Sequence, residues 1–152
     1  MLDEIDKKVL NELQENAKQK TYQLSKKLNI PRTTIHHRIK KLEDEGYIKG
    51  YKTLVDAKKL NKGLTVIIGV VVGIEANSRE VAAELMKIVQ VEEVYIISGR
   101  FDILLKVRLE NTDELAKIIF NLEHDVRKTH GISKTESMVV LSTEKEDGSI
   151  YL

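Results

Sequence analysis

The sequence has no cysteine and no tryptophan, a single proline, and only 5% aromatic residues among its 152 positions. Without cysteine it can form no disulfide, no thiolate zinc site and no cysteine nucleophile, which suits a reducing compartment. It also lacks a long hydrophobic run, because the most apolar stretch, 63–74, is 12 residues long and a membrane-spanning helix needs about 20. The first residues are acidic, whereas a signal peptide begins with basic and then apolar residues. We therefore expect a cytoplasmic protein with no membrane partner.

A chain of this length can build one ordinary domain or two small ones, since 41% of its residues are apolar. Its 25 Lys and Arg residues nearly balance 24 Asp and Glu residues, so the net charge of +1 indicates no partner by itself. The distribution is uneven: residues 1–62 carry a net charge of +6, and residues 63–152 a net charge of −5. A basic front half and an acidic back half predict two modules with different partners.

The front half has the periodicity of three short helices. Apolar residues at helical spacing predict a first helix over residues 4–15. Thr21 is expected to cap a second helix, which ends at a turn where Asn29 adopts the left-handed conformation. The third helix should begin near residue 31 and end at Gly46. This order of helices, with a tight turn before the last, is typical of a DNA-binding helix-turn-helix.

The outward face of the third helix carries the side chains suited to DNA. Hydroxyl and imidazole groups near its start can reach base edges, and lysines near its end can neutralise phosphates. The predicted DNA-binding residues are Arg32, Thr33, Thr34, His36, His37, Lys40 and Lys41. Arg38 lies close to the inward apolar stripe, so we expect it to pair with a carboxylate. A basic helix that is merely solvated is the simpler alternative. DNA binding is favoured by the turn before the helix and by the charge of residues 17–52, which hold ten Lys and Arg residues and three Asp and Glu residues.

Neither a metal nor a cofactor is expected. His36 and His37 are adjacent, but neighbouring side chains on a helix diverge by about 100°, and the sequence offers no third ligand beside them. After the third helix, residues 47–55 alternate in the pattern of a strand or small wing. We place the helix-turn-helix domain at residues 1–52, a polar linker at 53–63, a second domain at 64–143 and a C-terminal tail at 144–152.

In the second domain the period changes to that of buried strands. Strands are predicted over 65–74, 91–98, 102–109 and 132–143, with helices capped by Asn77 and Thr112 between them. The first helix should bury Val81, Leu85, Ile88 and Val89. The order βαββαβ is the ferredoxin-like split motif, so the fold class is α+β. Because two helices cover one face of such a sheet and the first strand is apolar in both registers, we expect a homodimer that covers the other face.

The hairpin between the second and third strands is a candidate effector site. Its sequence, Ser98-Gly99-Arg100-Phe101-Asp102, places an open backbone beside a cation and a carboxylate. Asp102 can bind the ammonium group of an amino acid, and Arg100 or backbone N–H groups can bind its carboxylate. A plain hairpin turn is the commoner meaning of such a motif. On the last strand, Thr135 and Ser137 place hydroxyl groups on one face.

Two blocks of residues resemble one protein family. The first comprises Leu2-Asp3-Glu4-Ile5-Asp6 through Leu13, Leu24-Ser25, Arg38-Ile39-Lys40-Lys41-Leu42-Glu43 and Gly46-Tyr47-Ile48-Lys49-Gly50-Tyr51, and the second is the hairpin 98–102. In this order and at this separation they resemble the Lrp/AsnC, or feast/famine, transcriptional regulators over nearly the whole chain. The resemblance implies a helix-turn-helix domain and a ferredoxin-like domain for ligand sensing and oligomerisation, in dimers that assemble into octamers.

The resemblance also implies an amino acid bound between dimers near the hairpin, at positions that correspond to Gly99 and Asp102, with Thr135 and Ser137 as co-ligands. Together with the hairpin's other polar groups, the expected effector-binding residues are Ser98, Gly99, Arg100, Asp102, Thr135 and Ser137. Asn29 and Pro31 stand where the family usually has a turn glycine and a capping serine, which affects where the third helix starts. Arg100 and Phe101 vary in the family and do not identify the effector.

Two other functions are weighed against this one. Siroheme decarboxylases are similar to the family in both domains and use histidine and arginine around a tetrapyrrole; the histidines here are the helix pair His36 and His37, and His124 and His130 near the turn before the last strand. A nonspecific architectural protein would bind unrelated duplexes equally, with a steep salt dependence. We predict a non-enzymatic, sequence-specific regulator that binds double-stranded DNA and responds to a small-molecule effector such as an amino acid.

Overall fold

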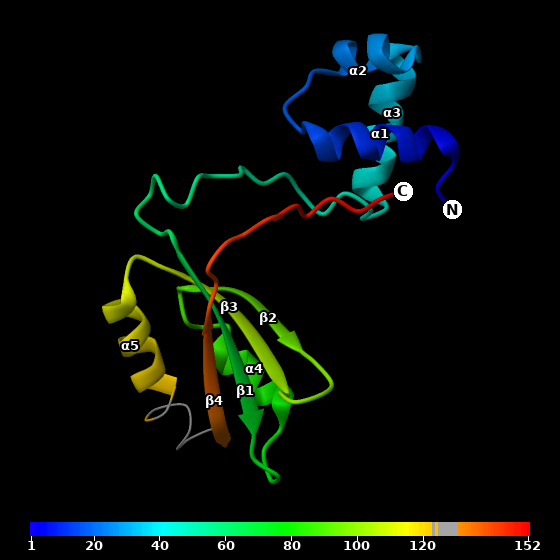
Figure 1. Ribbon diagram of the computed structural model, residues 1–152. Helices are drawn as coiled ribbons and strands as arrows, with labels where there is room; N and C mark the ends of the chain where they lie inside the picture. The colour runs from blue at the N-terminus through cyan, green and yellow to red at the C-terminus, as the bar shows by residue number, and fades with distance from the viewer. Residues whose placement is uncertain (123, 125–130) are drawn as a thin grey trace. The chain divides into compact units, whose positions relative to one another are not determined.

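The computed structural model describes residues 1–122, 124 and 131–152. The chain divides into two compact units (Figure 1). The first unit comprises residues 1–54 together with 145–152, and the second comprises residues 55–144. Within the described ranges, no helix combines the length and the apolar character needed to cross a bilayer.

Three helices build the first unit: α1 (Glu4–Glu15), α2 (Thr21–Leu28) and α3 (Arg32–Asp44). Asp3 and Asp6 form a capping box at the start of α1, because the Asp3 side chain accepts the Asp6 N–H at 2.8 Å and Asp6 Oδ2 accepts the Asp3 N–H at 3.2 Å. The turn between α2 and α3 depends on Asn29, whose φ of 54° and ψ of 44° are left-handed, as predicted. These local signals place the helix-turn-helix where the sequence predicts it.

The core of this unit is a small apolar cluster shared by the three helices. Val9 and Leu10 of α1, Leu24 of α2, and Ile35 and Leu42 of α3 are buried together. Burying one side chain of this kind contributes about 1.5–3 kcal/mol to stability. Because the buried residues of α3 fall on one stripe, the opposite face of that helix is left to solvent.

Two predictions for this unit are wrong in detail. Thr21 is the first residue of α2 rather than its cap; Lys20 is the N-cap, and its N–H donates to Gln23 Oε1 at 2.8 Å. Residues 47–55 form no strand, because an alternating pattern becomes a strand only when a neighbouring strand supplies backbone hydrogen bonds. This segment is instead held at its start by the Ile48 N–H, which donates to the carbonyl of Leu42 at 3.0 Å.

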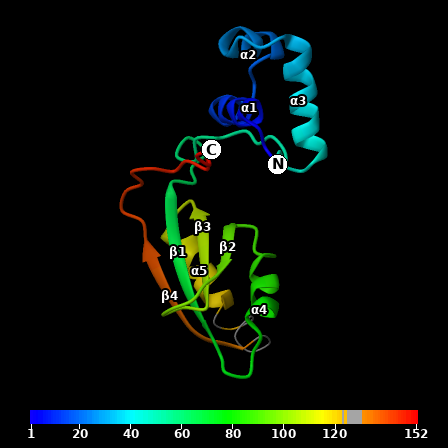
Figure 2. The ribbon, with the colours of Figure 1, turned by 90° about the vertical axis from the view of Figure 1, so that its right-hand side faces the viewer.

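The second unit contains β1 (Leu64–Val72), α4 (Ser78–Leu85), β2 (Val91–Ile96), β3 (Ile103–Leu109), α5 (Thr112–Asn121) and β4 (Ile132–Val139). Its strands form an antiparallel sheet in the order β2-β3-β1-β4. Both helices contribute to one core with the sheet and pack on the same face of it (Figure 2). This is the ferredoxin-like arrangement, and it confirms the predicted α+β fold class.

The two faces of the sheet differ in composition. Alternate residues of the central strands are buried beneath the helices: Val66, Ile68 and Val70 of β1, and Ile103, Leu105, Val107 and Leu109 of β3. The residues between them lie on the opposite, open face, because side chains alternate along a strand. There Ile67, Val71 and Leu104 are half-buried, and Lys106 pairs with Glu93 at 3.6 Å. The open face therefore has an apolar centre with charged residues beside it.

The ends of several elements differ from the predictions, and β1 and β2 each end two residues before the predicted residues 74 and 98. Asn111 rather than Thr112 caps α5, since its side chain accepts a backbone N–H of the first turn at 3.0 Å. Helix α4 ends at Leu85, so Val89 lies beyond it and is 94% exposed instead of buried. Strand β4 ends at Val139, before the predicted residue 143. Element ends are decided by which backbone groups find partners, which periodicity does not specify.

Candidate DNA-binding surface and effector site

Helix α3 presents most of the predicted DNA-binding residues to solvent. Arg32, Thr33, His36, His37 and Lys40 are exposed, whereas Thr34 and Lys41 are half-buried. The buried residues Ile35 and Leu42 fix the other side of the helix in the core. The helix begins at Arg32, and its N-cap, Pro31, supplies no side-chain hydrogen bond. The exposed residues from Arg32 to Lys40 thus form one basic and hydroxyl-bearing surface on a helix that is held in place, and the exposed acids Glu43 and Asp44 follow at its end.

Asp6 is buried at the contact between α1 and α3 although it is an acid. Its carboxylate accepts hydrogen bonds from Arg38 Nη1 at 3.0 Å and from Lys41 Nζ at 3.3 Å, and Arg38 also pairs with Asp3. The predicted pairing of Arg38 with a carboxylate is confirmed. Lys41, predicted as a phosphate contact, has its ammonium group beside Asp6. The sequence pattern did not predict that Asp6 is a buried partner of Arg38 and Lys41. Its position three residues after Asp3, which is that of a capping box, was the available signal.

This network lowers the pKa of both aspartates. Burial raises the pKa of Asp6, but the hydrogen bonds from the Asp3 N–H, Arg38 and Lys41 together outweigh it. The pKa of Asp3 is lowered chiefly by the hydrogen bond from the Asp6 N–H. Desolvation, the next largest cause, opposes this, and Arg38 and the Ile5 N–H add to the lowering. In turn, hydrogen bonds to Asp3 and Asp6 raise the pKa of Arg38. The folded unit therefore favours the charged form of each group.

Acidification should destabilise the first unit through these two aspartates. Their folded pKa values lie below the ordinary 3.8, so the stabilisation is complete above that value and is lost as the pH falls through the folded pKa values. We expect the urea midpoint of this unit to be constant from about pH 7 to 5 and to fall below about pH 4. An Asp6→Asn variant should show a smaller acid-dependent fall. Equal falls in both proteins would show that Asp6 does not carry the effect.

The hairpin after β2 is laid across the open face of the sheet. Gly99 has a φ of 125°, a conformation that favours glycine. The Phe101 ring lies so close to Gly69 of β1 that a Cβ there would be 2.7 Å from three ring carbons. Arg100 lies over that ring, 5.3 Å from its centroid, and donates to Glu136 of β4 at 2.6 Å. The hairpin therefore contacts both β1 and β4.

Asp102 has a structural hydrogen bond that its proposed ligand role does not include. Its Oδ2 accepts the Val72 N–H at 2.7 Å, and its own N–H donates to the Val70 carbonyl at 2.9 Å. These bonds continue the contact of β1 with β3 beyond their last residue pair, Val70 with Ile103. Any substitution of Asp102 thus affects a backbone partner as well as a ligand.

The predicted effector residues are divided between the two faces of the sheet. Thr135 and Ser137 pair with buried residues of β1, so their side chains lie on the helix-covered side, at the sheet edge. Arg100 reaches Glu136 on the open side, while Ser98 and Gly99 are exposed in the hairpin. The structure therefore joins the hairpin to β4 through Glu136, which the sequence argument did not single out. Its place between two hydroxyl residues was the only signal.

The histidines belong to different parts of the molecule. His36 and His37 are exposed on α3 in the first unit, and His124, after α5 in the second, stacks on Phe120 with ring centroids 4.1 Å apart. His130 lies outside the described residues. Among the residues that the structure does describe, no group of three or more His, Cys, Asp or Glu side chains could hold a metal ion.

Family models match both units. Residues 2–49 match a winged helix-turn-helix DNA-binding model, and residues 65–150 match the Lrp/AsnC ligand binding domain. An uncharacterized HTH-type transcriptional regulator of Pyrococcus abyssi is 41% identical over 97% of each chain. The leucine-responsive regulatory protein of Haemophilus influenzae is 33% identical over 99% of this chain and 90% of its own. The matches extend over nearly the whole chain in both relatives.

A solved structure of a transcriptional regulator has the same architecture. The transcriptional regulator of Neisseria meningitidis in complex with L-Met superposes with a TM-score of 0.88 at 28% identity, over 99% of this chain and 96% of that one. The two units, their order and the ferredoxin-like sheet are thus accounted for by one architecture. The chain belongs to the Lrp/AsnC family and is a transcriptional regulator of that type, with a DNA-binding helix-turn-helix and a ligand-binding domain.

Proposed function

We propose that this regulator recognises a specific sequence in double-stranded DNA through α3 and changes its occupancy when an amino acid binds its second unit. The observation that carries the DNA part is the exposed face of α3 between residues 32 and 40, which presents Arg32, Thr33, His36, His37 and Lys40. Hydroxyl and imidazole groups can read base edges in the major groove, which admits one helix. The cations supply phosphate binding that does not depend on sequence.

The proposed effector is an amino acid, which the L-Met complex of the Neisseria relative supports. Its proposed ligands are Ser98, Gly99, Arg100 and Asp102 of the hairpin and Thr135 and Ser137 of β4. A ligand of this kind changes DNA binding only if it binds two states of the protein with different affinity. The two states that we propose differ in how dimers assemble into octamers.

The proposed dimer covers the open face of the sheet. Ile67, Val71 and Leu104 form a half-buried apolar centre there, and an apolar centre that a single chain leaves partly uncovered, with polar residues around it, is typical of a protein interface. A dimer would present two copies of α3 to successive major grooves of a pseudo-palindromic site. The lack of cysteine suits the cytoplasm, in which we place the protein, and we assign it no catalytic step.

The proposal is tested by selecting bound sequences from a random duplex pool at fixed salt, with and without a mixture of amino acids. We expect one pseudo-palindromic motif, with an occupancy that one amino acid changes. If no motif is recovered, the protein is not sequence-specific, and a visible absorption band on addition of a tetrapyrrole would then favour the decarboxylase alternative. A motif with no amino-acid response would support the DNA-binding role and contradict the effector.

Two substitutions on α3 should separate base reading from phosphate binding. His37→Ala should relax the preference at one base position by about 1–3 kcal/mol, whereas Lys40→Ala should weaken binding to all duplexes alike and reduce the salt slope by about 1. Titrations of the selected site and of single-base variants, each at several salt concentrations, measure both effects. A uniform loss for His37→Ala would mean that this side chain contacts the backbone instead of a base.

Asp102 should be essential for the amino-acid response even when its structural hydrogen bond is retained. Asp102→Asn keeps an oxygen for the Val72 N–H but removes the charge, so we expect the amino-acid affinity to fall at least about tenfold and DNA binding without effector to be unchanged. Asp102→Ala should also destabilise the second unit by about 1–3 kcal/mol, because a backbone donor loses its acceptor. Calorimetric titration and thermal unfolding of both variants make the comparison. A wild-type response in Asp102→Asn would leave Asp102 a structural role only.

A further inference from the structure

The end of the chain lies against the helix-turn-helix. Residues 145–152 belong to the first compact unit rather than to the second, from which they emerge. Both backbone groups of Ile150 are bonded to one side chain of α1: the Ile150 N–H donates to Gln14 Oε1 at 2.6 Å, and Gln14 Nε2 donates to the Ile150 carbonyl at 2.9 Å. A side-chain amide thus takes the place that a neighbouring strand would occupy in a sheet.

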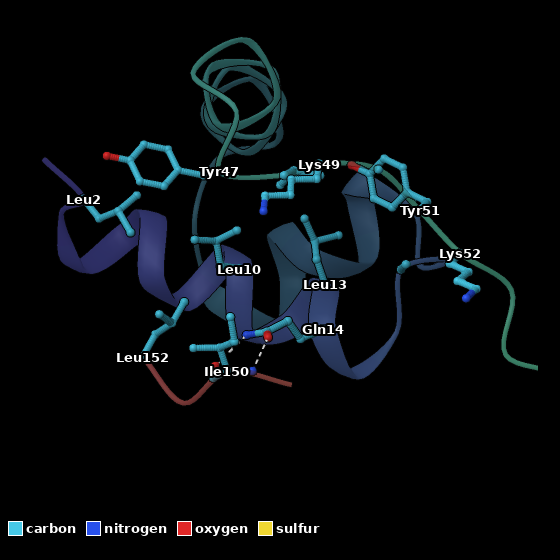
Figure 3. A pocket seen from close by; sticks show the side chains of 13 residues that line it. Leu2, Leu10, Leu13, Gln14, Tyr47, Lys49, Tyr51, Lys52, Ile150 and Leu152 are labelled. Carbon is cyan, nitrogen blue, oxygen red and sulfur yellow. Dashed lines mark hydrogen bonds between the residues drawn. The ribbon is translucent and has the colours of Figure 1, made fainter. Parts of the chain in front are cut away.

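The surface under this segment is an apolar groove with a cavity of about 350 Å³. Its floor is formed by Leu10 and Leu13 of α1, one wall by the extended segment 47–52, and the other wall by Ile150 and Leu152 (Figure 3). In that view the Gln14 side chain points toward Ile150, and both hydrogen bonds are drawn between them. The groove therefore combines apolar contact with a hydrogen-bonding pair for a peptide backbone.

The sequence of the tail fits this groove. Residues 144–149 are polar, and three apolar residues, Ile150, Tyr151 and Leu152, follow them. Residues 150 and 152 line the groove while Tyr151 between them is 99% exposed, which is the two-residue alternation of an extended strand. Leu152 is the more covered of the pair, 39% exposed against 69% for Ile150. Just before them, the Ser149 N–H donates to Asp147 Oδ1 at 2.9 Å, a turn that fixes the backbone entering the groove.

We propose that residues 149–152 are a docking segment that binds the groove on α1. The Gln14 amide binds both backbone groups of Ile150 and so favours an extended backbone, and the groove binds the Leu152 side chain. The occupant is the segment of the same chain. The segment is covalently joined to the second unit through residue 144, so its non-covalent docking gives the helix-turn-helix a second attachment to that unit, in addition to the linker after residue 54. That connection starts at the end of β4, the strand that carries Thr135 and Ser137. Docking itself does not depend on the proposed effector or on DNA.

The test measures docking directly in the full-length protein. In the wild type we expect slow amide exchange at Ile150 and nuclear Overhauser contacts between the methyl groups of Leu152 and those of Leu10 or Leu13. Gln14→Ala should accelerate exchange at Ile150 at least tenfold. Lys8→Ala, at an exposed position of the same helix, is the control and should leave that exchange unchanged. A chain that ends at residue 148 should lower the melting temperature of the first unit by about 4 °C.

The outcomes decide the proposal without any ligand. Ile150 exchange at the rate of an unstructured peptide in the wild type, or equal exchange in the wild type and Gln14→Ala, would overturn it. A mixture of isotope-labelled and unlabelled chains identifies the occupant of the groove. Contacts between Leu152 of one copy and Leu10 of another would show that the segment comes from a second copy, which would overturn docking within one chain. Protection lost in Gln14→Ala, retained in Lys8→Ala and confined to contacts within one chain would establish the docking segment.

Discussion

Replacing Arg38 with alanine is expected to destabilise the helix-turn-helix unit by about 3 kcal/mol, because it removes a cationic partner from the buried Asp6 carboxylate. Lys41, at 3.3 Å from the same carboxylate, offsets only part of the loss. Urea unfolding followed through the NMR signals of Val9 and Leu24 would report on this unit alone. DNA affinity should fall with it at temperatures near the lowered melting point.

Two further variants separate the ion pair from the general effect of substitution on α3. Lys40→Ala, at an exposed position of the same helix, should change the free energy of unfolding by less than about 0.5 kcal/mol. Combining Arg38→Ala with Asp6→Ala should cost less than the sum of the single changes, because no buried charge is then left without its partner. A loss below about 1 kcal/mol for Arg38→Ala would show that Asp6 is satisfied without it.

Placing a methyl group at Gly69 should displace the hairpin that carries the proposed effector ligands. A Cβ at Gly69 would approach three carbons of the Phe101 ring to 2.7 Å, and these include the ring carbon attached to the side-chain stem, so a small ring rotation does not relieve the contact. We expect Gly69→Ala to destabilise the second unit by about 1–3 kcal/mol. The amino-acid response should be lost as well, since Arg100 and Asp102 flank Phe101. Thermal unfolding and calorimetric titration measure the two effects.

The matched control for Gly69→Ala is the same change in a chain with Phe101→Ala. The three atoms nearest to the new methyl group all belong to the ring, so Gly69→Ala should be nearly neutral in a chain without that ring. A double-mutant cycle gives the interaction energy between the two positions, which we expect to exceed about 1 kcal/mol. Additive effects would mean that β1 accommodates the methyl group by another movement and that the close packing of Phe101 is not required.

The sequence predicted the helix-turn-helix more fully than the site on the second unit. Capping and turn residues such as Asp3 and Asn29 act through bonds to near neighbours, so their consequences follow from local order. Thr21 and Thr112 are each one residue from the true cap: the Gln23 side chain accepts the Lys20 N–H, and the Asn111 side chain accepts the Glu114 N–H in place of Thr112. The 47–55 pattern failed as a strand prediction for a different reason: pairing depends on a partner that alternation alone does not provide.

The proposed effector ligands show most clearly what a sequence pattern cannot predict, namely which residues of different strands face each other. The hairpin 98–102 and the hydroxyl residues of β4 are each visible in the sequence, but which of them face each other depends on the register of β4 on β1. That register puts Glu136 opposite Gly69 and within reach of Arg100, and it turns Thr135 and Ser137 to the other side. A shift of one residue would reverse this arrangement without altering the composition of the strand.

By itself, the sequence determined the order of the helices, the order of elements in the second unit and the basic outward face of α3, because helix and strand periods, caps and turn residues are local and are read in chain order. The family followed from the resemblance of two blocks of residues. Only the tertiary structure decided that Asp6 is buried between two cations, that Phe101 packs on Gly69 and that Ile150 is clamped by Gln14. These contacts join residues 32 to 136 positions apart. Contacts at such separations depend on how whole elements pack, which no local pattern records.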